Sequence, residues 1–277
     1  MNILIYTQCF APKIGGIEKV MTNIAKQAFK SKHNVTVLAD GHMLASLDTD
    51  NKSKFKIYRF DQLKFLRKRI KSSFADKFLN ENQIDLIIFD SWKSIESFSS
   101  NIEVKKFCLV HGNEILNIKN KLRIIKAFRK ADKIIFNSNF TKNKTFKNFK
   151  ILKKIDHQIV YPAFIKKVSK IDTTRKKYDL CTVARLEYRK GHHLVFEAMS
   201  ILKKSHNIVL KYAVLGDGPE LSRLKDLVMK FSLQKQVDFI YPDYPSEKIF
   251  KSSSIHVMPT LTMPNSVEGF GISNVKL

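Results

Sequence analysis

Short apolar runs alternate with stretches of helical periodicity along the first part of the chain. Strand-like runs occupy residues 2–6, 34–38, 54–58, 86–89, 106–110 and 134–137. After the first run, Val20, Ile24 and Ala28 recur at the spacing of one helix face, which predicts a helix over residues 17–31. Strands that alternate with helices predict a parallel sheet covered by helices on both faces.

The alternation pauses over residues 161–177, which contain Pro162 and many lysines and show no clear periodicity. We interpret this stretch as a linker. A second α/β series follows, with strands predicted at 179–184, 209–215, 237–240 and 255–258 and helices at 192–204, 219–231 and 245–251. The pattern therefore predicts two Rossmann-like domains, residues 1–164 and 178–277, that face a cleft. In such sheets ligands bind at the carboxyl ends of the strands, so chemistry is expected in the loops there.

Two glycine-containing loops follow predicted strands. Gly15 and Gly16 precede the first helix, where free backbone N–H groups and the helix dipole suit a phosphate. An ordinary glycine turn is the alternative. Because no GxGxxG pattern is present, a dinucleotide oxidoreductase is disfavoured. In the second domain, Gly216 follows a strand and would allow either a tight turn or close packing over a nucleobase.

Charged and polar residues follow three other predicted strands. His111 comes directly after one strand, and could orient a substrate hydroxyl or serve a structural role. Arg185 and Lys190 lie in one loop before Gly191, and could converge on a diphosphate or belong to a solvated basic loop. Near the C-terminus, Glu268 could accept hydrogen bonds from sugar hydroxyls. The backbone N–H groups that could hold phosphate beside it belong to Phe270, Gly271 and Ile272.

The composition of the chain adds an excess of positive charge. Its 277 residues include 50 Lys and Arg against 25 Asp and Glu, a net charge of +25. Such an excess attracts an anionic membrane or a nucleic acid. The lysines are scattered, so a compositional bias without function is the alternative. We find no basic stripe interleaved with aromatic residues, and we expect no nucleic-acid partner.

Cysteine usage and the N-terminus predict a cytoplasmic protein, free or peripheral on the inner face of the cell membrane. Cys9, Cys108 and Cys181 are far apart and have no metal-binding spacing, so we expect three reduced thiols. No apolar run approaches the length that spans a bilayer, which takes about 20 residues. The first residues are typical of a strand rather than a signal peptide.

Taken in order, these segments resemble glycosyltransferase family 4, the group 1 glycosyltransferases. The matching segments are FAPKIGGIEKV, HGNE, FNSNFTKN, VARLEYRKGHHLVFEAM, VLGDGPELSRL and PNSVEGFGIS. The resemblance implies a GT-B fold and a retaining hexosyl transfer from a nucleoside-diphosphate sugar. The acceptor would be a cell-surface glycan or a lipid-linked molecule, as in polysaccharide or lipopolysaccharide biosynthesis. It implies no bound metal and no other cofactor.

The resemblance also assigns roles to single residues. Arg185 and Lys190 would match the cations that bind the donor diphosphate, and Gly16 would match the N-terminal phosphate loop. Glu268 would match the first of two paired glutamates and contact the donor sugar. His111 would match the histidine near the sugar and the acceptor.

The end of the chain departs from the family pattern. Lys276 stands where the second glutamate would bind the nucleotide ribose, and Leu277 follows it. We therefore expect a truncated C-terminal domain, from a frameshift, a premature stop or a split gene, with the first domain still able to fold. A chain truncated there is expected not to turn over a nucleotide-sugar. The alternative function is accordingly an inactive remnant that survives at most as a binding or interaction module.

Overall fold

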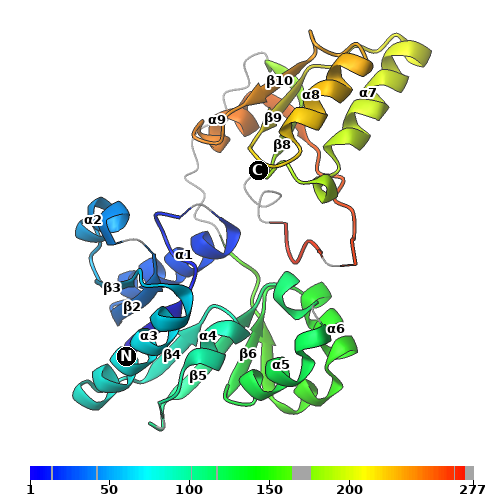
Figure 1. Cartoon of the computed structure of the whole chain (residues 1–277). Helices are drawn as coiled ribbons and strands as arrows, with labels where there is room; N and C mark the ends of the chain where they lie inside the picture. Colours follow the sequence, from blue (N-terminus) through cyan, green and yellow to red (C-terminus); the bar gives the residue numbers. More distant parts are fainter. Residues whose placement is uncertain are drawn as a thin grey trace. The chain divides into compact units, whose positions relative to one another are not determined.

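The computed structural model describes residues 1–13, 15–41, 43–100, 102–116, 118–163, 176–264 and 266–271. The chain divides into two units, Met1–Ala163 and Phe164–Leu277. This boundary falls inside the stretch that the sequence indicates as a linker. Each unit is built around its own parallel sheet, and each is described separately (Figure 1).

The described part of the first unit contains one sheet of seven parallel strands in the order β3-β2-β1-β4-β5-β6-β7. These strands are β1 (Asn2–Thr7), β2 (Asn34–Asp40), β3 (Lys56–Phe60), β4 (Leu86–Phe89), β5 (Lys105–Val110), β6 (Lys133–Phe136) and β7 (Asp156–Ile159). The helices between them are α1 (Gly16–Lys30), α2 (Met43–Asn51), α3 (Lys64–Glu81), α4 (Trp92–Ser97), α5 (Lys121–Phe128) and α6 (Asn139–Asn148). Short 3-10 turns occupy Asn113–Ile115, Ile118–Asn120 and Lys150–Lys154.

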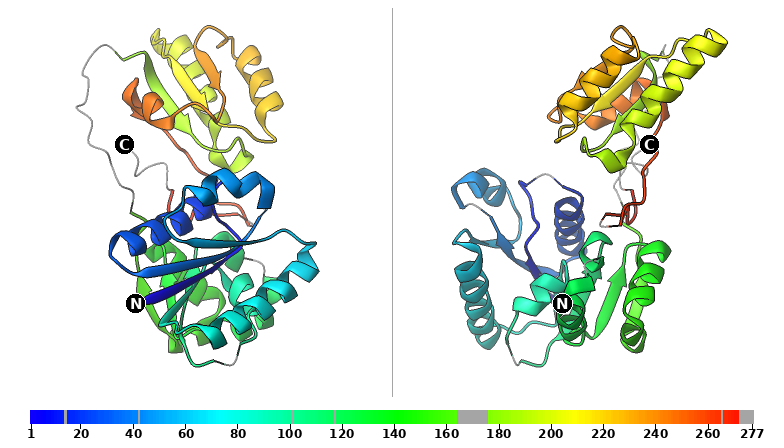
Figure 2. Two further views of the ribbon diagram at one scale, coloured as in Figure 1. Left: turned by 90° about the vertical axis from the view of Figure 1, so that its left-hand side faces the viewer. Right: turned by 45° about the vertical axis from the view of Figure 1, so that its right-hand side comes forward.

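Alternate residues of the central strands point to opposite faces of this sheet. Ile5 and Val37 pack against Met21 and Ala25 of α1 on one face. On the other face the ring of Tyr6 lies against those of Phe89 and Phe98, beside α4. The sheet therefore has helices on both faces, as the alternating pattern predicts (Figure 2).

The described part of the second unit contains a four-stranded parallel sheet in the order β10-β9-β8-β11. Its strands are β8 (Tyr178–Val183), β9 (Tyr212–Leu215), β10 (Val237–Ile240) and β11 (Ser253–His256), and its helices are α7 (His192–His206), α8 (Leu221–Lys230) and α9 (Ser246–Lys251). A core cluster that includes Phe196 of α7 and Leu224 of α8 packs against Tyr212 and Val214. Ala213 and Leu215 face the other way, toward Ile249 of α9. Both units are Rossmann-like.

Helix α3 is the largest element that the apolar pattern did not reveal. Ala75 and Leu79 are buried, whereas Leu66 and Ile70 are exposed on the far side of the same helix. Apolar residues on two opposite sides leave no single stripe with the period of a helix. Strand β7 (DHQI) was missed because polar residues alternate with half-buried ones at the sheet edge.

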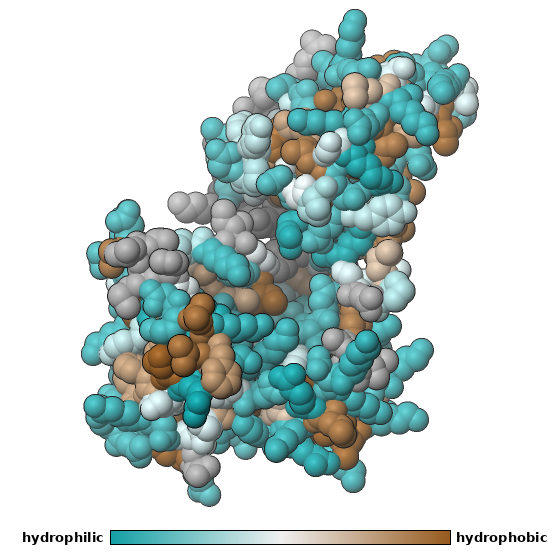
Figure 3. All heavy atoms as spheres, viewed as in Figure 1, coloured by the Kyte–Doolittle hydropathy of each residue, from teal (hydrophilic) through white to brown (hydrophobic). Residues whose placement is uncertain are grey.

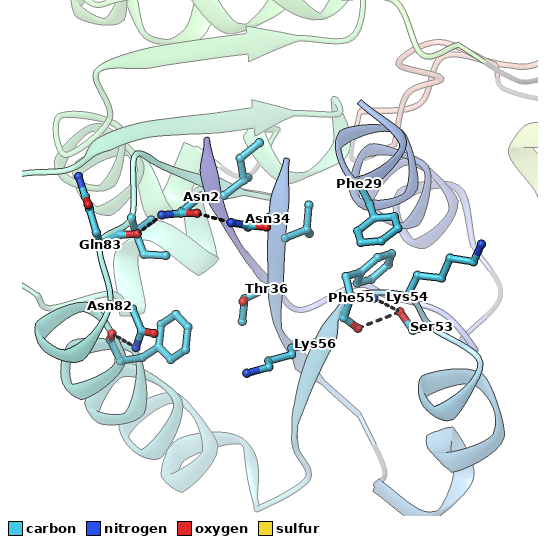
Figure 4. Close-up of a pocket in the computed structure, with 14 residues that line it drawn as sticks. Asn2, Phe29, Asn34, Thr36, Ser53, Lys54, Phe55, Lys56, Asn82 and Gln83 are labelled. Carbon is cyan, nitrogen blue, oxygen red and sulfur yellow. Dashed lines mark hydrogen bonds between the residues drawn. The ribbon is translucent and has the colours of Figure 1, made fainter. Parts of the chain in front are cut away.

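A pocket of about 610 Å³ lies at the amino ends of β1, β2 and β3 (Figure 4). Its wall is held by side-chain amides, because Asn34 Nδ2 donates to Asn2 Oδ1 at 2.8 Å and Asn2 Nδ2 donates to the Gln83 carbonyl at 2.7 Å. Parallel α/β sheets bind ligands at the opposite, carboxyl ends of their strands. We therefore assign no catalytic role to this pocket.

Candidate active site

The carboxyl edge of the first sheet contains a topological switch point between β1 and β4, because the chain continues from β1 to β2 on one side and later to β4 on the other. Asp90, buried at the end of β4, occupies this point. Its carboxylate accepts hydrogen bonds from Thr7 Oγ1 at 2.9 Å and from the backbone nitrogens of Gln8 and Cys9 at 2.9 and 3.2 Å. Asp90 thereby anchors the start of the loop that leads to Gly15 and Gly16.

His111 follows β5 at the same edge, and its ring lies against the Asp90 backbone. His111 Nε2 is 3.0 Å from the Asp90 carbonyl oxygen. Because a carbonyl only accepts, Nε2 carries the hydrogen, which leaves Nδ1 as the ring nitrogen that can accept a hydrogen bond. Asn137 Nδ2 donates to the His111 carbonyl at 3.1 Å, which fixes the backbone of this loop.

His111 also lines a cavity of about 420 Å³ in the first unit. The cavity has apolar walls from α1 and from β4, β5 and β6, including Ile24, Ile88 and Ile135. A polar side chain in the wall of an otherwise apolar cavity is a common arrangement in small-molecule sites. The sequence missed Asp90, although a carboxylate directly after an apolar strand could have indicated it.

The Gly15-Gly16 loop carries an acidic side chain at the start of α1. Glu18 is 8% exposed, and a Cβ added to Gly15 would lie 2.0 Å from Glu18 Oε2. A carboxylate in the first turn is favoured by the helix dipole. Glu18 thus supplies negative charge where the sequence predicts a phosphate, so the phosphate role of Gly15 and Gly16 stays a prediction.

Two loops of the second unit are joined by a chain of ion pairs. Glu268, in the segment after β11, accepts hydrogen bonds from Arg189 Nη1 at 2.8 Å and from Lys190 Nζ. Arg189 Nε is also 3.1 Å from Glu187 Oε2, and Arg185 Nη1 is 2.9 Å from Glu187 Oε1. The loop after β8 and the Gly-rich segment therefore form one charged cluster, the Glu268 cluster.

The Glu268 carboxyl is ionised in this cluster. Burial acts to raise its pKa, but the hydrogen bonds and charges of Lys190 and Arg189 outweigh burial, so the pKa lies below its ordinary value of 4.5. The side chains of Lys190, Arg189 and Glu268 are 10%, 14% and 27% exposed, so solvent screens these contacts only in part. Arg185, by contrast, has a side chain that is 75% exposed.

The structure thus brings together two of the predicted donor-side residues, Lys190 and Glu268. It adds Arg189, which sequence reasoning passed over because three cations stand in one short loop and periodicity does not distinguish them. Gly271 has φ +71°, a left-handed conformation that favours glycine. The predicted contributions of Ile272 and Lys276 lie outside the described residues.

Close approach of backbone explains the glycines of this region. A Cβ added to Gly216 would lie 1.9 Å from the Ala184 carbonyl oxygen, and one added to Gly191 would lie 2.1 Å from the Pro259 carbonyl oxygen. Their φ values, +155° and +73°, are unfavourable for other residues. The chain itself therefore requires Gly216, whether or not a nucleobase packs there.

We expect Gly216→Ala to lower the free energy of unfolding by about 2–3 kcal/mol, because both the contact and the φ angle must relax. Urea unfolding of the variant measures this, with an exposed substitution such as Ser205→Ala in α7 as the control. An unchanged midpoint would mean that this loop does not approach β8 as described.

His192 makes the stability of the second unit dependent on pH. Burial lowers the pKa of His192 from 6.5 to about 4. The unfolded chain therefore binds the proton first as pH falls, and stability decreases from pH 6.5 to about 4, by up to about 1.4 kcal/mol per unit. Urea unfolding at pH 7 and pH 5 should show this difference in the parent and not in His192→Gln. If the free energy of unfolding changed equally with pH in the parent and in His192→Gln, His192 would not be the cause of the pH dependence.

The described residues give three further facts about function. They contain no group of His, Cys, Asp or Glu side chains that could hold a metal ion. In those same segments no helix has the length and apolar character to cross a bilayer. Cys9, Cys108 and Cys181 are free thiols, and burial raises the pKa of each. Such thiols are poor nucleophiles.

Two family models match the chain. The model for Glycosyltransferase Family 4 matches residues 14–161, more than half of the chain, and the model for Glycosyl transferases group 1 matches residues 164–276. The chain therefore belongs to the family 4, group 1 glycosyltransferases.

Individual relatives agree with this assignment. The chain is 25% identical over 263 residues to an uncharacterized glycosyltransferase of Haemophilus influenzae, covering 90% of this chain and 71% of that protein. The crystal structure of TarM has a TM-score of 0.76 at 12% identity, covering 100% of this chain and 82% of TarM. The lipopolysaccharide outer core galactosyltransferase WaaB has a TM-score of 0.68 at 17% identity, covering 99% and 76%. These structures show that the fold is of the GT-B type.

Proposed function

We propose that this chain transfers a hexosyl group, with retention of anomeric configuration, from a nucleoside-diphosphate sugar to a cell-surface glycan or a lipid-linked acceptor. The observation that carries the proposal is the Glu268 cluster, in which Arg189 and Lys190 hold the carboxylate of a Gly-rich loop. Support for the donor class comes from an S. aureus TarM mutant whose crystal structure contains UDP. Support for a role in polysaccharide or lipopolysaccharide biosynthesis comes from WaaB.

The charges of the cluster suit a diphosphate leaving group. As the bond between the anomeric carbon and the diphosphate oxygen breaks, negative charge grows on that oxygen. Lys190 and Arg189 already bind a carboxylate, and Arg185 has an exposed planar guanidinium that can bind two phosphate oxygens at once. Cations held in place before the reaction stabilise the transition state more than the ground state.

In this proposal, Glu268 and His111 each form hydrogen bonds with a different hydroxyl group. The Glu268 carboxylate can accept hydrogen bonds from sugar hydroxyls of the donor. The accepting Nδ1 of His111 can orient a hydroxyl group in the first unit. The proposal includes no metal and no organic cofactor, because Arg185, Arg189 and Lys190 supply the positive charge.

A donor screen tests the proposal. Uridine-, guanosine- and adenosine-diphosphate sugars are offered with and without a lipid-linked acceptor, and release of the nucleoside diphosphate is measured. Release with one donor is expected, and the anomeric proton coupling of the product reports retention. Binding of a nucleotide without release from any donor would favour an inactive remnant, and inverted product would contradict the retaining mechanism.

A further inference from the structure

The first turns of α3 expose an unusual set of side chains. Leu63, Phe65, Leu66 and Ile70 are 80%, 70%, 50% and 43% exposed, although each is large and apolar. Five of the eight residues 64–71 are Lys or Arg, and residues 62–75 contain no acidic residue. We call this surface the α3 patch; its residues are Leu63, Lys64, Phe65, Leu66, Lys68, Arg69 and Ile70. Figure 3 shows apolar side chains gathered over the start of α3 with hydrophilic ones around them.

The start of α3 is held in place by polar contacts rather than by its apolar residues. Lys71 Nζ, on a side chain that is 2% exposed, donates to the Thr7 carbonyl at 2.9 Å and to Asp40 Oδ1 at 2.5 Å. It also lies 4.4 Å from the centre of the Tyr6 ring, and Arg67 Nε lies 2.9 Å from Asp40 Oδ2. These contacts attach α3 to the carboxyl ends of β1 and β2.

The apolar residues of the patch point away from this attachment. Leu66 and Ile70 are one helical turn apart, on the side opposite the buried Lys71 and Ala75. They contribute little to the core, so burial of their apolar surface is available to a partner. A single exposed apolar side chain is ordinary, but four large apolar side chains exposed within about two helical turns mark an interaction surface.

We propose that the α3 patch attaches this protein to an anionic lipid bilayer. A helix with apolar side chains beside lysines and arginines lies in the membrane interface, where the apolar side chains enter the acyl boundary and the cations meet lipid phosphates. The long stems of Lys64, Lys68 and Arg69 allow their charged ends to reach the headgroups while the stems lie along apolar surface. Arg69 already lies 5.7 Å from the centre of the Phe65 ring.

Charge complementarity favours a bilayer over a folded protein as the partner. Each basic residue near an anionic leaflet contributes about 1 kcal/mol of attraction, and residues 62–75 contain five basic residues and no acidic one. A stable protein interface buries about 800 Å² on each side, whereas the α3 patch is formed by two turns of one helix. The patch also starts right after the end of β3, at the carboxyl edge that carries Asp90 and His111.

This attachment does not require transferase activity, because it is measured without a donor. The protein is sedimented with vesicles of phosphatidylglycerol and phosphatidylcholine, and with vesicles of phosphatidylcholine alone, at 0.1 M salt. We expect binding to the anionic vesicles only. Two patch variants are compared with two matched controls elsewhere in the first unit. The apolar patch variant is Leu63→Ser/Leu66→Ser/Ile70→Ser, and its control is Leu47→Ser/Leu122→Ser/Ile151→Ser. The charge patch variant is Lys64→Gln/Lys68→Gln/Arg69→Gln, and its control is Lys147→Gln/Lys150→Gln/Lys153→Gln.

The charge variant of the patch is expected to lose roughly a hundredfold in vesicle affinity, and the apolar variant at least about tenfold. The controls change the same number of residues of the same kind and should bind nearly as the parent does, since the Debye length of about 10 Å screens distant charges. Equal losses in patch and control variants, or equal binding to neutral vesicles, would overturn the proposal.

A second measurement keeps the proposal testable if a triple variant does not fold. The single tryptophan of the chain, Trp92, is 1% exposed, so its emission is a constant background. In Phe65→Trp the new indole should shift its emission to the blue when anionic vesicles are added, whereas in Leu122→Trp it should not. No shift in Phe65→Trp while the protein sediments with the vesicles would place the attachment at another surface.

Discussion

Replacing Lys190 with alanine is expected to lower turnover of the donor sugar by about 10²–10³-fold, which corresponds to about 3–4 kcal/mol of transition-state stabilisation. Lys190 Nζ contacts Glu268 from a side chain that is only 10% exposed. Its charge is therefore little screened and is held in position before the reaction. The free energy of unfolding should change much less, because Arg189 still pairs with Glu268 at 2.8 Å.

The measurement is kcat and KM for the best donor of the screen, together with urea unfolding. Lys203→Ala is the matched control, because Lys203 is also in the second unit and its Nζ donates to the Ser232 carbonyl, at 2.8 Å, rather than to the Glu268 cluster. Arg185→Ala should also lower turnover, with a smaller effect on stability because that side chain is 75% exposed. If Lys190→Ala turned over the donor as fast as the parent does, Lys190 would have no role in the donor site.

Replacing Glu268 with glutamine is expected to reduce both stability and turnover. The amide keeps the shape of the side chain but removes the charge that Arg189 and Lys190 share. Loss of two charge-assisted hydrogen bonds at a largely buried group should lower the free energy of unfolding by about 1–3 kcal/mol at pH 7. Turnover should fall by about a hundredfold, because the two cations lose the group that positions them.

The pH dependence of this difference follows from the direction of the pKa shift. The Glu268 pKa is lower in the folded state than its ordinary value of 4.5, so its contribution is complete above pH 4.5 and is lost as pH falls through the folded pKa. The gap in unfolding free energy between parent and Glu268→Gln should therefore narrow in acid. Glu220→Gln, which breaks the more exposed Arg223–Glu220 pair, should show a smaller gap. If the difference in unfolding free energy between the parent and Glu268→Gln did not depend on pH, this would contradict our conclusion that Glu268 is ionised in the cluster.

Most strands of both sheets were predictable because they contain runs of three or four apolar residues, such as LIIF in β4 and YAVL in β9, bounded by polar loops. Helices with one apolar face, such as α1 and α8, were predictable for the same reason. Helix α3 was not, because its outward residues Leu66 and Ile70 are apolar as well. A pattern rule assumes that apolar side chains face the core, and the α3 patch breaks that assumption.

The sequence by itself determined the fold class, the family and the short list of charged residues in the loops after the strands, because those depend on residue type and spacing along the chain. Only the tertiary structure decided which of them meet. Arg189 and Lys190 both contact Glu268, which lies 79 and 78 positions further along the chain, respectively. Likewise Asp90 binds the loop after β1 from 82 positions away. Such contacts are set by the order of strands in the sheet and by backbone approaches like that of Gly216 to Ala184, which local propensity does not encode.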